Sequence, residues 1–378
     1  MPQSVSDNPA APVYDRAPKV VHQTVRQIVY PDLSGAQARI EISNRYGRTP
    51  LVIDLARIAY ARPAGAIDPA SDRTLSFGGR ADVTIPPGQT VTSDPAALTV
   101  RRGEPLAISF YLPGSNAPAT WHKLASQVNY LSVAGDHTAD VGGAAFRMRF
   151  TSYLWLSGLA VDAGDAKTYA VVTIGDSITD GMRSTLNANR RWPDELARRT
   201  KQDVAVVNAG ISGNRLLSDS PCYGERLAAR FDADALAQPG ARVAVVLIGI
   251  NDINFAAMPP HAGLDCDMPH TRVDSTQLIA GYRALIAAAH ARGVRILGAT
   301  VTPAGLPPAR EAIRLAVNQW IRQSGAFDGV LDFDAVLRDP TEPSRLLPRY
   351  DSGDHIHPSD AGYAAMADSV PLDLLTSR

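Results

Sequence analysis

The second half of the chain contains the run Val243-Ala244-Val245-Val246-Leu247-Ile248, six apolar residues in succession. A strand whose neighbouring side chains are all apolar is typical of a parallel sheet that is covered on both faces. Segments of similar character recur at wide spacing on either side of this run. The predicted strands of this half span residues 169–174, 204–208, 243–248, 294–300 and 330–333.

Amphipathic helices are predicted between these strands. Residues 275–291 repeat apolar side chains at helical spacing, with Ser275 placed to cap the start and Gly293 to end the helix. Residues 309–324 form a second such pattern, with Ile313, Val317, Trp320 and Ile321 facing inward. The alternation predicts an α/β fold: a doubly wound parallel sheet of about five strands with helices on both faces. In such sheets the active site lies beyond the carboxyl ends of the strands.

The first half has a different pattern, with short strands separated by Gly- and Pro-containing turns. Predicted strands span residues 20–30, 38–43, 51–61, 73–77, 82–85, 97–100, 105–112, 127–133 and 146–156. Within residues 107–112 the side chains partly alternate, as in a half-buried antiparallel strand. This half is therefore predicted to be an all-β, sandwich-like domain. We place the domains at 1–163 and 164–378, with the boundary in the short polar stretch 161–167.

Composition and charge exclude several classes of protein. The chain has 378 residues, which favours two domains, and 45% of them are hydrophobic, an ordinary globular balance. The 37 basic and 38 acidic side chains leave a formal charge of −1, which gives no support to a nucleic-acid partner. No apolar run approaches the roughly 20 residues of a membrane helix. Neither a G-x-S-x-G motif nor a P-loop lysine is present.

Polar segments follow the predicted strands, and they contain the residue types that nucleophilic catalysis needs: a serine, a histidine, an aspartate and hydrogen-bond donors. Gly175-Asp176-Ser177, Gly213-Asn214 and Gly249-Ile250-Asn251-Asp252 each come after a strand, and Asp354-His355-Ile356-His357-Pro358 follows the last one. A serine hydroxyl needs an imidazole to accept its proton, and the imidazole needs a carboxylate on its other nitrogen. Asp354 and His357 can supply that pair. The oxyanion needs preorganised donors, which the backbone N–H groups of Ser177 and Gly213 and the Asn251 amide can provide.

Together these four segments resemble the conserved blocks of the SGNH (GDSL-type) serine hydrolases, in order and in approximate spacing. The resemblance covers about residues 168–370 and implies Ser177 as nucleophile, His357 as base and Asp354 as its orienting acid. It also implies an oxyanion hole formed by Ser177, Gly213 and Asn251. The leucine usual after the G-D-S is Ile178 here, a conservative change. The first half resembles the β-rich domain of one branch of the family, that of acylhydrolases associated with xylan breakdown.

The predicted function is that of a serine carboxylic-ester hydrolase acting on short acyl esters, including acetylated carbohydrates, through an acyl-enzyme. An aryl esterase or a longer-chain lipase of the same family is the alternative within this class. A non-catalytic carbohydrate-binding protein is the alternative outside it. The expected partner is a small-molecule or saccharide ester, with no cofactor, and the expected location is secreted or periplasmic, a cytosolic one being the alternative.

Several residues near these segments have two interpretations. Asp176 and Asp252 are predicted to be local hydrogen-bond anchors, and Asp176 and His355 are candidates for the pocket lining. His355 and His357, beside Asp354, are alternative candidates for metal ligands, and so are Asp265, Asp267 and His270. No metal is expected. The chain has two cysteines, Cys222 and Cys266, in loops that follow the predicted oxyanion segments. A disulfide between them is predicted, and it favours an exported protein.

Overall fold

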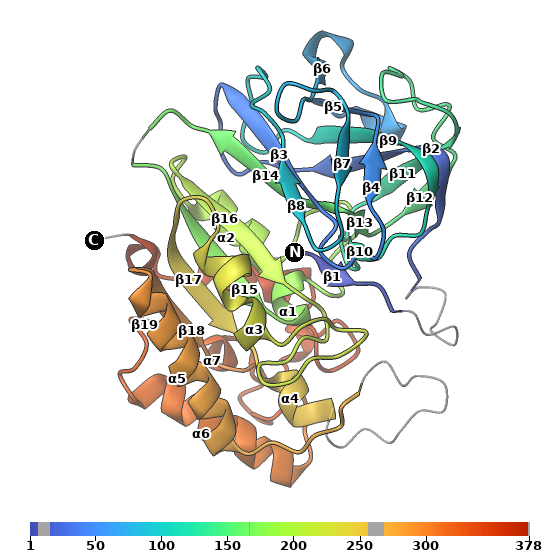
Figure 1. Cartoon of the computed structure of the whole chain (residues 1–378). Helices are drawn as coiled ribbons and strands as arrows, with labels where there is room; N and C mark the ends of the chain where they lie inside the picture. The colour runs from blue at the N-terminus through green and yellow to red at the C-terminus, as the bar shows by residue number, and fades with distance from the viewer. Residues whose placement is uncertain (7–15, 166, 256–267, 377–378) are drawn as a thin grey trace. The chain divides into compact units, whose positions relative to one another are not determined.

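A computed structural model describes residues 1–6, 16–165, 167–255 and 268–376 of the chain. The described residues form two compact units, the first ending at Thr168 and the second beginning at Tyr169 (Figure 1). Each unit has its own sheets, and the two are described separately. The proposed domain boundary after residue 163 stays a prediction.

The first unit is built from antiparallel strands, as predicted. Its largest sheet has six strands in the order β12-β11-β2-β9-β5-β6, and smaller sheets have the orders β14-β3-β8, β1-β10-β13 and β4-β7. The strands are β1 (Gln3–Ser4), β2 (Val20–Val29), β3 (Gln37–Ser43), β4 (Leu51–Ile53), β5 (Leu55–Tyr60), β6 (Arg73–Thr74), β7 (Val83–Ile85), β8 (Thr90–Thr92), β9 (Leu106–Asn116), β10 (Thr120–His122), β11 (Asn129–Ala134), β12 (Met148–Phe150), β13 (Tyr153–Leu154) and β14 (Leu156–Asp162).

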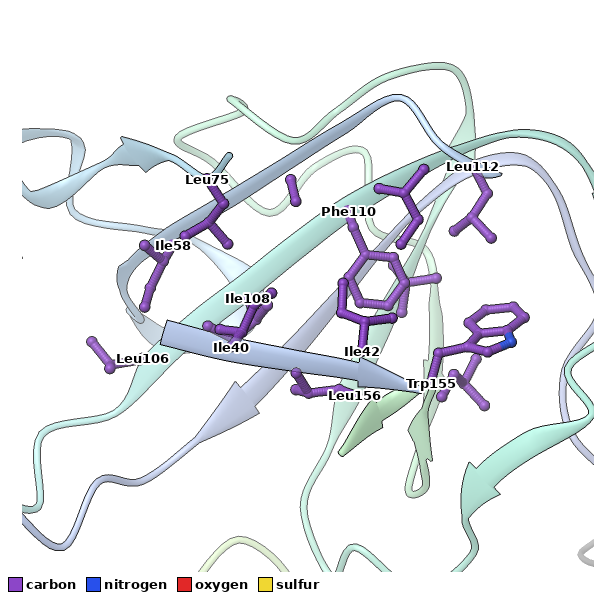
Figure 2. Close-up of a cluster of buried hydrophobic side chains, with 14 of the residues drawn as sticks. Ile40, Ile42, Ile58, Leu75, Leu106, Ile108, Phe110, Leu112, Trp155 and Leu156 are labelled. Atoms are coloured by element: carbon purple, nitrogen blue, oxygen red, sulfur yellow. The ribbon is translucent and has the colours of Figure 1, made fainter. Parts of the chain in front are cut away.

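Two sheets of this unit share one hydrophobic core. Ile40 and Ile42 of β3 and Ile108 and Phe110 of β9 are fully buried in it, and Figure 2 shows them pointing toward one another. The ring of Phe110 meets that of Trp155 edge to face at 6.3 Å between centroids. Apolar side chains from two stacked sheets are what a sandwich requires, so the predicted fold class of this half is confirmed.

The strand predictions for this unit were wrong in detail. Residues 97–100 form only an isolated bridge between Gly35 and Val100, and the short strands β1, β8 and β10 were missed. The middle of β9 is buried on both faces instead of half-buried. Ala107 lies in a second apolar cluster, and Ser109 accepts a hydrogen bond from buried Arg26. Arg26 also donates to the carbonyls of loops that cover this face, which sequence periodicity does not reveal.

The second unit contains a five-stranded parallel sheet in the order β16-β15-β17-β18-β19, which confirms the predicted doubly wound α/β fold. The strands are β15 (Tyr169–Gly175), β16 (Val204–Gly210), β17 (Ala241–Leu247), β18 (Arg295–Ala299) and β19 (Gly329–Leu331). Because β15 pairs with both β16 and β17, the chain changes direction across the sheet at β15. Ligands bind at such switch points in open α/β sheets.

The connections between the strands of the second unit are mostly helical. The α-helices are α1 (Ser177–Asp180), α2 (Trp192–Arg199), α3 (Leu227–Phe231), α4 (Ile250–Phe255), α5 (Ser275–Ala291), α6 (Pro308–Gln323), α7 (Phe333–Leu337) and α8 (Asp360–Asp368). The N-cap of α5 is Asp274 and not Ser275, because the Asp274 carboxylate accepts the N–H of Gln277 at 2.8 Å. No described helix is long and apolar enough to cross a bilayer.

Candidate active site

The predicted nucleophile lies where β15 turns into α1. β15 ends at Gly175, α1 begins at Ser177, and Asp176 is the N-cap between them. The Asp176 carboxylate accepts a hydrogen bond of 3.0 Å from the N–H of Ile178, which closes the turn. The Ser177 hydroxyl is therefore held at the carboxyl end of the strand, on a residue that is 5% exposed.

His357 contacts both residues with which it was predicted to work. Its Nε2 lies 2.8 Å from Ser177 Oγ, and its Nδ1 lies 2.8 Å from Asp354 Oδ2. An ionised carboxylate can only accept a hydrogen bond, so Nδ1 carries the ring hydrogen and Nε2 is free to accept a proton. This geometry allows the Ser177 hydroxyl to pass its proton to the imidazole.

The Asp354 carboxylate is held by groups from two segments. Its Oδ1 accepts the backbone N–H groups of Ile356 and His357 at 3.1 and 2.8 Å, and its Oδ2 accepts Arg183 Nε at 3.0 Å beside His357 Nδ1. Burial alone would raise the pKa of Asp354. The hydrogen bonds from the His357 side chain and backbone, together with the His357 charge, outweigh burial and hold this pKa well below its ordinary value. The carboxylate therefore stays ionised at neutral pH.

The three predicted oxyanion donors come from three segments. Ser177 is the first residue of α1, Gly213 lies in the loop after β16, and Asn251 lies in α4. Among the described residues, the backbone N–H groups of Ser177 and Gly213 donate to no protein acceptor. Asn251 Nδ2 donates to the Asn214 carbonyl at 3.0 Å, which ties α4 to the residue next to Gly213. A primary amide has two hydrogens, so the second one remains available for a substrate oxygen.

Gly213 is required at its position for two reasons. Its φ is +78°, in the left-handed region that side chains disfavour. A Cβ at this residue would also lie 2.2 Å from Cδ1 of Tyr223. The Tyr223 ring packs on Phe255 at 5.2 Å between centroids, and the Arg215 guanidinium lies 4.5 Å from the centroid of Phe255. The loop that carries Gly213 is thus backed by a layer of ring and guanidinium groups.

Asp252 anchors the same loop from α4. Its two carboxylate oxygens accept the N–H groups of Leu216 and Leu217 at 2.8 and 3.0 Å, and the residue is 3% exposed. Burial raises the pKa of Asp252 to about 6 despite these bonds. Burial likewise raises the pKa of Asp176 to about 7, and the nearby charges of Asp252 and Asp180 act in the same direction. These contacts are the ones expected of hydrogen-bond anchors.

The other candidates stand apart from this arrangement. The side chain of His355 is 73% exposed, and its Nδ1 lies 2.6 Å from Asp351 Oδ2. Cys222 is buried, and no described cysteine is a free thiol. Cys266, Asp265 and Asp267 lie outside the described residues, so the pairing of the cysteines stays a prediction. Within the described part of the chain, no group of three His, Cys, Asp or Glu side chains is arranged to hold a metal ion.

Sequence reasoning missed two arginines that support the site. Arg183 binds Asp354, as described above. Arg230, which is 2% exposed, donates to the carbonyls of Gly175 and Ala209 and to Asn214 Oδ1, and so joins the ends of β15 and β16 to the loop that carries Gly213. Its ion pair with Asp234, four residues further along, is a signal that the sequence contains. No local pattern connects Arg183 with Asp354, which lies 171 residues away.

A family model covers this arrangement. Residues 173–365, just over half of the chain, match the GDSL-like lipase/acylhydrolase family, and every contact between Ser177, His357, Asp354 and Arg183 lies inside that range. The chain belongs to the GDSL-like lipase/acylhydrolase family. The resemblance inferred from the four sequence blocks is thereby confirmed at the level of the family. As a family member, the protein is a hydrolase of the GDSL type.

The chain is also similar to solved structures over about half of its length. One is a GDSL-like lipase from Bacteroides thetaiotaomicron, with 19% identity and a TM-score of 0.38. The match covers 56% of this chain and 93% of the lipase chain. Another is the acetylxylan esterase Axe2 from Geobacillus stearothermophilus, with 22% identity and a TM-score of 0.41, which covers 55% of this chain and 95% of its own. No curated protein matches the sequence.

Proposed function

We propose that this GDSL-family hydrolase is a serine carboxylic-ester hydrolase with Ser177 as nucleophile, His357 as general base and Asp354 as the orienting acid. The observation that carries the proposal is the 2.8 Å distance between His357 Nε2 and Ser177 Oγ, at the carboxyl end of β15. The matching 2.8 Å distance from Nδ1 to Asp354 supports the assignment of the ring hydrogen to Nδ1, which leaves Nε2 free to accept the Ser177 proton. A serine hydroxyl becomes a competent nucleophile in this setting.

The reaction would proceed through an acyl-enzyme. Ser177 Oγ attacks the ester carbonyl carbon while its proton passes to His357 Nε2. The tetrahedral oxyanion accepts hydrogen bonds from the Ser177 and Gly213 N–H groups and from Asn251 Nδ2. Collapse of this intermediate breaks the bond to the alcohol, which leaves with the proton of His357. Water then repeats the same steps on the acyl-enzyme and releases the acid.

We propose short acyl groups, acetyl first, as the preferred substrates. The loop after Gly213 is polar at the surface: Asp219 is exposed and forms an ion pair with Arg226 at 3.3 Å. A site for long acyl chains needs a large apolar lining, which such charges disfavour. An acetylated carbohydrate is the natural substrate class that fits this proposal, with aryl esters as the alternative.

The proposal is tested with p-nitrophenyl acetate, butyrate, octanoate and palmitate. The wild type should be most active on acetate or butyrate. Ser177→Ala and His357→Ala should each lower kcat by about 1,000-fold or more, because the members of such a triad act as a unit. Circular dichroism provides the control for folding. A wild type that is inert on every ester would sink the proposed reaction, and a maximum on palmitate would overturn the proposed chain length alone.

We also propose that the chain has two domains, 1–163 and 164–378, and works outside the cytosol, secreted or periplasmic. The support for export is the predicted disulfide between Cys222 and Cys266, because disulfides persist in oxidising compartments. Thiol titration of the denatured, unreduced protein should find no free thiol. Two free thiols would contradict the bridge and remove this argument for export.

A further inference from the structure

Arg183 closes a ring of contacts around the candidate active site. Ser177 Oγ meets His357 Nε2, His357 Nδ1 meets Asp354 Oδ2, and the same oxygen accepts Arg183 Nε at 3.0 Å. Arg183 lies six residues after Ser177 in the sequence, on the segment that directly follows α1. The backbone therefore joins the last member of the ring to the first. Arg183 is therefore a direct contact between the segment after Ser177 and the Asp354 carboxylate.

The segment that carries Arg183 is held in one conformation by independent contacts. Arg183 has φ of +70°, which is uncommon for a residue with a side chain; this conformation costs free energy and persists only where neighbouring contacts hold it. Ser184 donates to the Gly181 carbonyl on the preceding side through both its N–H, at 3.0 Å, and its Oγ, at 2.7 Å. The Tyr363 hydroxyl donates to the Met182 carbonyl at 2.7 Å. Arg183 is thus placed by its surroundings.

Thr185 connects this segment with α8. Its N–H and hydroxyl donate to the two oxygens of Asp360 at 2.9 and 2.6 Å. Asp360 is the first residue of α8 and lies three residues after His357. The segment 182–185 therefore contacts the polypeptide on both sides of His357. These contacts hold the loop that carries Asp354 and His357 against residues 182–185, which follow the helix that begins at Ser177.

We infer that Arg183 is a positioning residue, whose guanidinium holds the Asp354 carboxylate in the orientation that presents His357 to Ser177. The inference rests on the proposed ester hydrolysis. The guanidinium offers Nε in a fixed plane, so it determines where Oδ2 lies as well as attracting its charge. The backbone N–H groups of Ile356 and His357 hold only the other oxygen, Oδ1. Arg183 thus completes the support of the carboxylate.

A role in positioning, and not in folding, follows from the exposure of the pair. The Arg183 side chain is 58% exposed and that of Asp354 is 23% exposed, and ion pairs this open to water add little to stability. Other charges near the loop have partners of their own: His355 pairs with Asp351, and Asp360 with Thr185. The effect of removing Arg183 should therefore appear in the rate.

The test compares Arg183→Ala, Arg183→Lys and a matched control, Arg292→Ala, in the full chain. Arg292 pairs with Asp232 at 2.7 Å at the end of α5, and its side chain is 55% exposed, so its exposure is similar to that of Arg183 while the pair contains none of the candidate site residues. On p-nitrophenyl acetate, Arg183→Ala should lower kcat by about tenfold with little change in KM, below the roughly 100-fold cost of a 1 Å misplacement. The melting temperature should change no more than in the control.

Two rescues separate positioning from a general disturbance. Millimolar guanidinium ion added to Arg183→Ala should restore about half of the lost rate, because it returns a planar N–H donor to Asp354 Oδ2. Arg183→Lys should restore less, because the lysine ammonium returns the charge without the plane. Guanidinium should change neither Ser177→Ala nor the Arg292 control. An unchanged kcat overturns the inference. A rise in KM with kcat unchanged also overturns it, because it would assign Arg183 to substrate binding. A loss that neither rescue restores overturns it as well.

The failure of this inference can be told apart from failure of the proposed function. The rate at which a fluorophosphonate probe labels Ser177 reports the activated hydroxyl without any ester substrate. A wild type that neither hydrolyses esters nor is labelled would refute both proposals. If the wild type is active or labelled and Arg183→Ala reacts as fast, only the positioning role is refuted.

Discussion

At the scale of single residues, the candidate site depends on which atoms are absent as well as on which are present. Gly213 has no Cβ, and this lets its φ of +78° coexist with the Tyr223 ring 2.2 Å from where a Cβ would be. Gly293, at the end of α5, has a similar φ of +68°, but a Cβ there would meet nothing within 4 Å. Alanine substitutions at these two glycines therefore separate the free-energy cost of the backbone conformation from the effect of displacing the loop that carries Gly213.

Gly213→Ala should therefore lower both stability and activity, and Gly293→Ala only stability. Each substitution places an alanine at positive φ, which costs about 1–2 kcal/mol. Only Gly213→Ala must also move Tyr223 or the proposed oxyanion N–H, and we expect kcat on p-nitrophenyl acetate to fall at least tenfold. Urea unfolding and steady-state kinetics measure the two effects. Equal kcat values for both variants would refute the role given to Gly213.

The buried carboxyl beside the nucleophile makes stability depend on pH. Burial raises the pKa of Asp176 to about 7, above its unfolded value near 3.8. A raised carboxyl pKa contributes stability that is fully present below the unfolded pKa and is lost as the pH rises through the folded pKa. For Asp176 that loss falls between about pH 4 and pH 7.

Asp176→Asn removes this ionisation while its amide oxygen can still accept the Ile178 N–H. The variant should gain in free energy of unfolding relative to wild type as the pH rises from about 5 to 8, by up to about 3 kcal/mol, because about two pH units of the loss lie in this range. Urea unfolding of both proteins at the two pH values measures the difference, with the acidic measurement as the internal control. A variant that loses stability relative to wild type toward higher pH would contradict the expected sign.

At the scale of elements, the start of α5 shows how the structure chooses between two adjacent capping residues. Asp274 and Ser275 both have side chains that cap helices well. The Asp274 carboxylate accepts the Gln277 N–H at 2.8 Å, and Gln277 Oε1 accepts the Asp274 N–H at 3.0 Å, which forms a capping box. Ser275 is already the first residue of the helix.

Replacement of the two residues should therefore have unequal effects. Asp274→Ala should lower the free energy of unfolding by about 1 kcal/mol, the usual cost of losing an N-cap. Ser275→Ala, the matched control, should change it by less than about 0.5 kcal/mol, because alanine is a good helix residue. Neither should alter kcat, since the hydrogen bonds of the Asp274 carboxylate and N–H in the described part of the chain go to Gln277 and not to the candidate site residues. Equal losses would mean that Ser275 shares the capping role.

At the scale of the whole molecule, the two compact units are joined by a short polar connection. β14 ends at Asp162 and β15 begins at Tyr169, and neither helix nor strand is formed by the described residues between them. The chain contains only four lysines, Lys19, Lys123, Lys167 and Lys201, and the exposed Lys167 lies in this connection. Domain boundaries are the segments that proteases reach most easily.

A lysine-specific protease at low dose should therefore cut first after Lys167 and produce fragments 1–167 and 168–378. Mass spectrometry of the early digest identifies the cut. Lys167→Arg is the control, because it keeps the charge and removes the cleavage site. If the first cut falls after Lys123, inside the first unit, the proposed division of the chain would be wrong.

The sequence by itself determined the fold class of both halves and the family. Continuous apolar runs mark parallel strands, and short strands with Gly and Pro turns mark the sandwich, because both patterns arise from neighbouring residues. The identities of Ser177, His357 and Asp354 were also accessible, since each stands in a short motif at a predicted strand end or in the last loop.

Only the tertiary structure decided which groups hold that site together. Arg183 meets Asp354 across 171 residues, and Asp252 meets the N–H of Leu216 across 36. The order β16-β15-β17 and the double burial of β9 likewise depend on which segments pack against one another. Periodicity records the environment of each side chain along its own helix or strand. It carries no information about the partner that a distant segment brings, and for that reason the supporting contacts appear only in the folded chain.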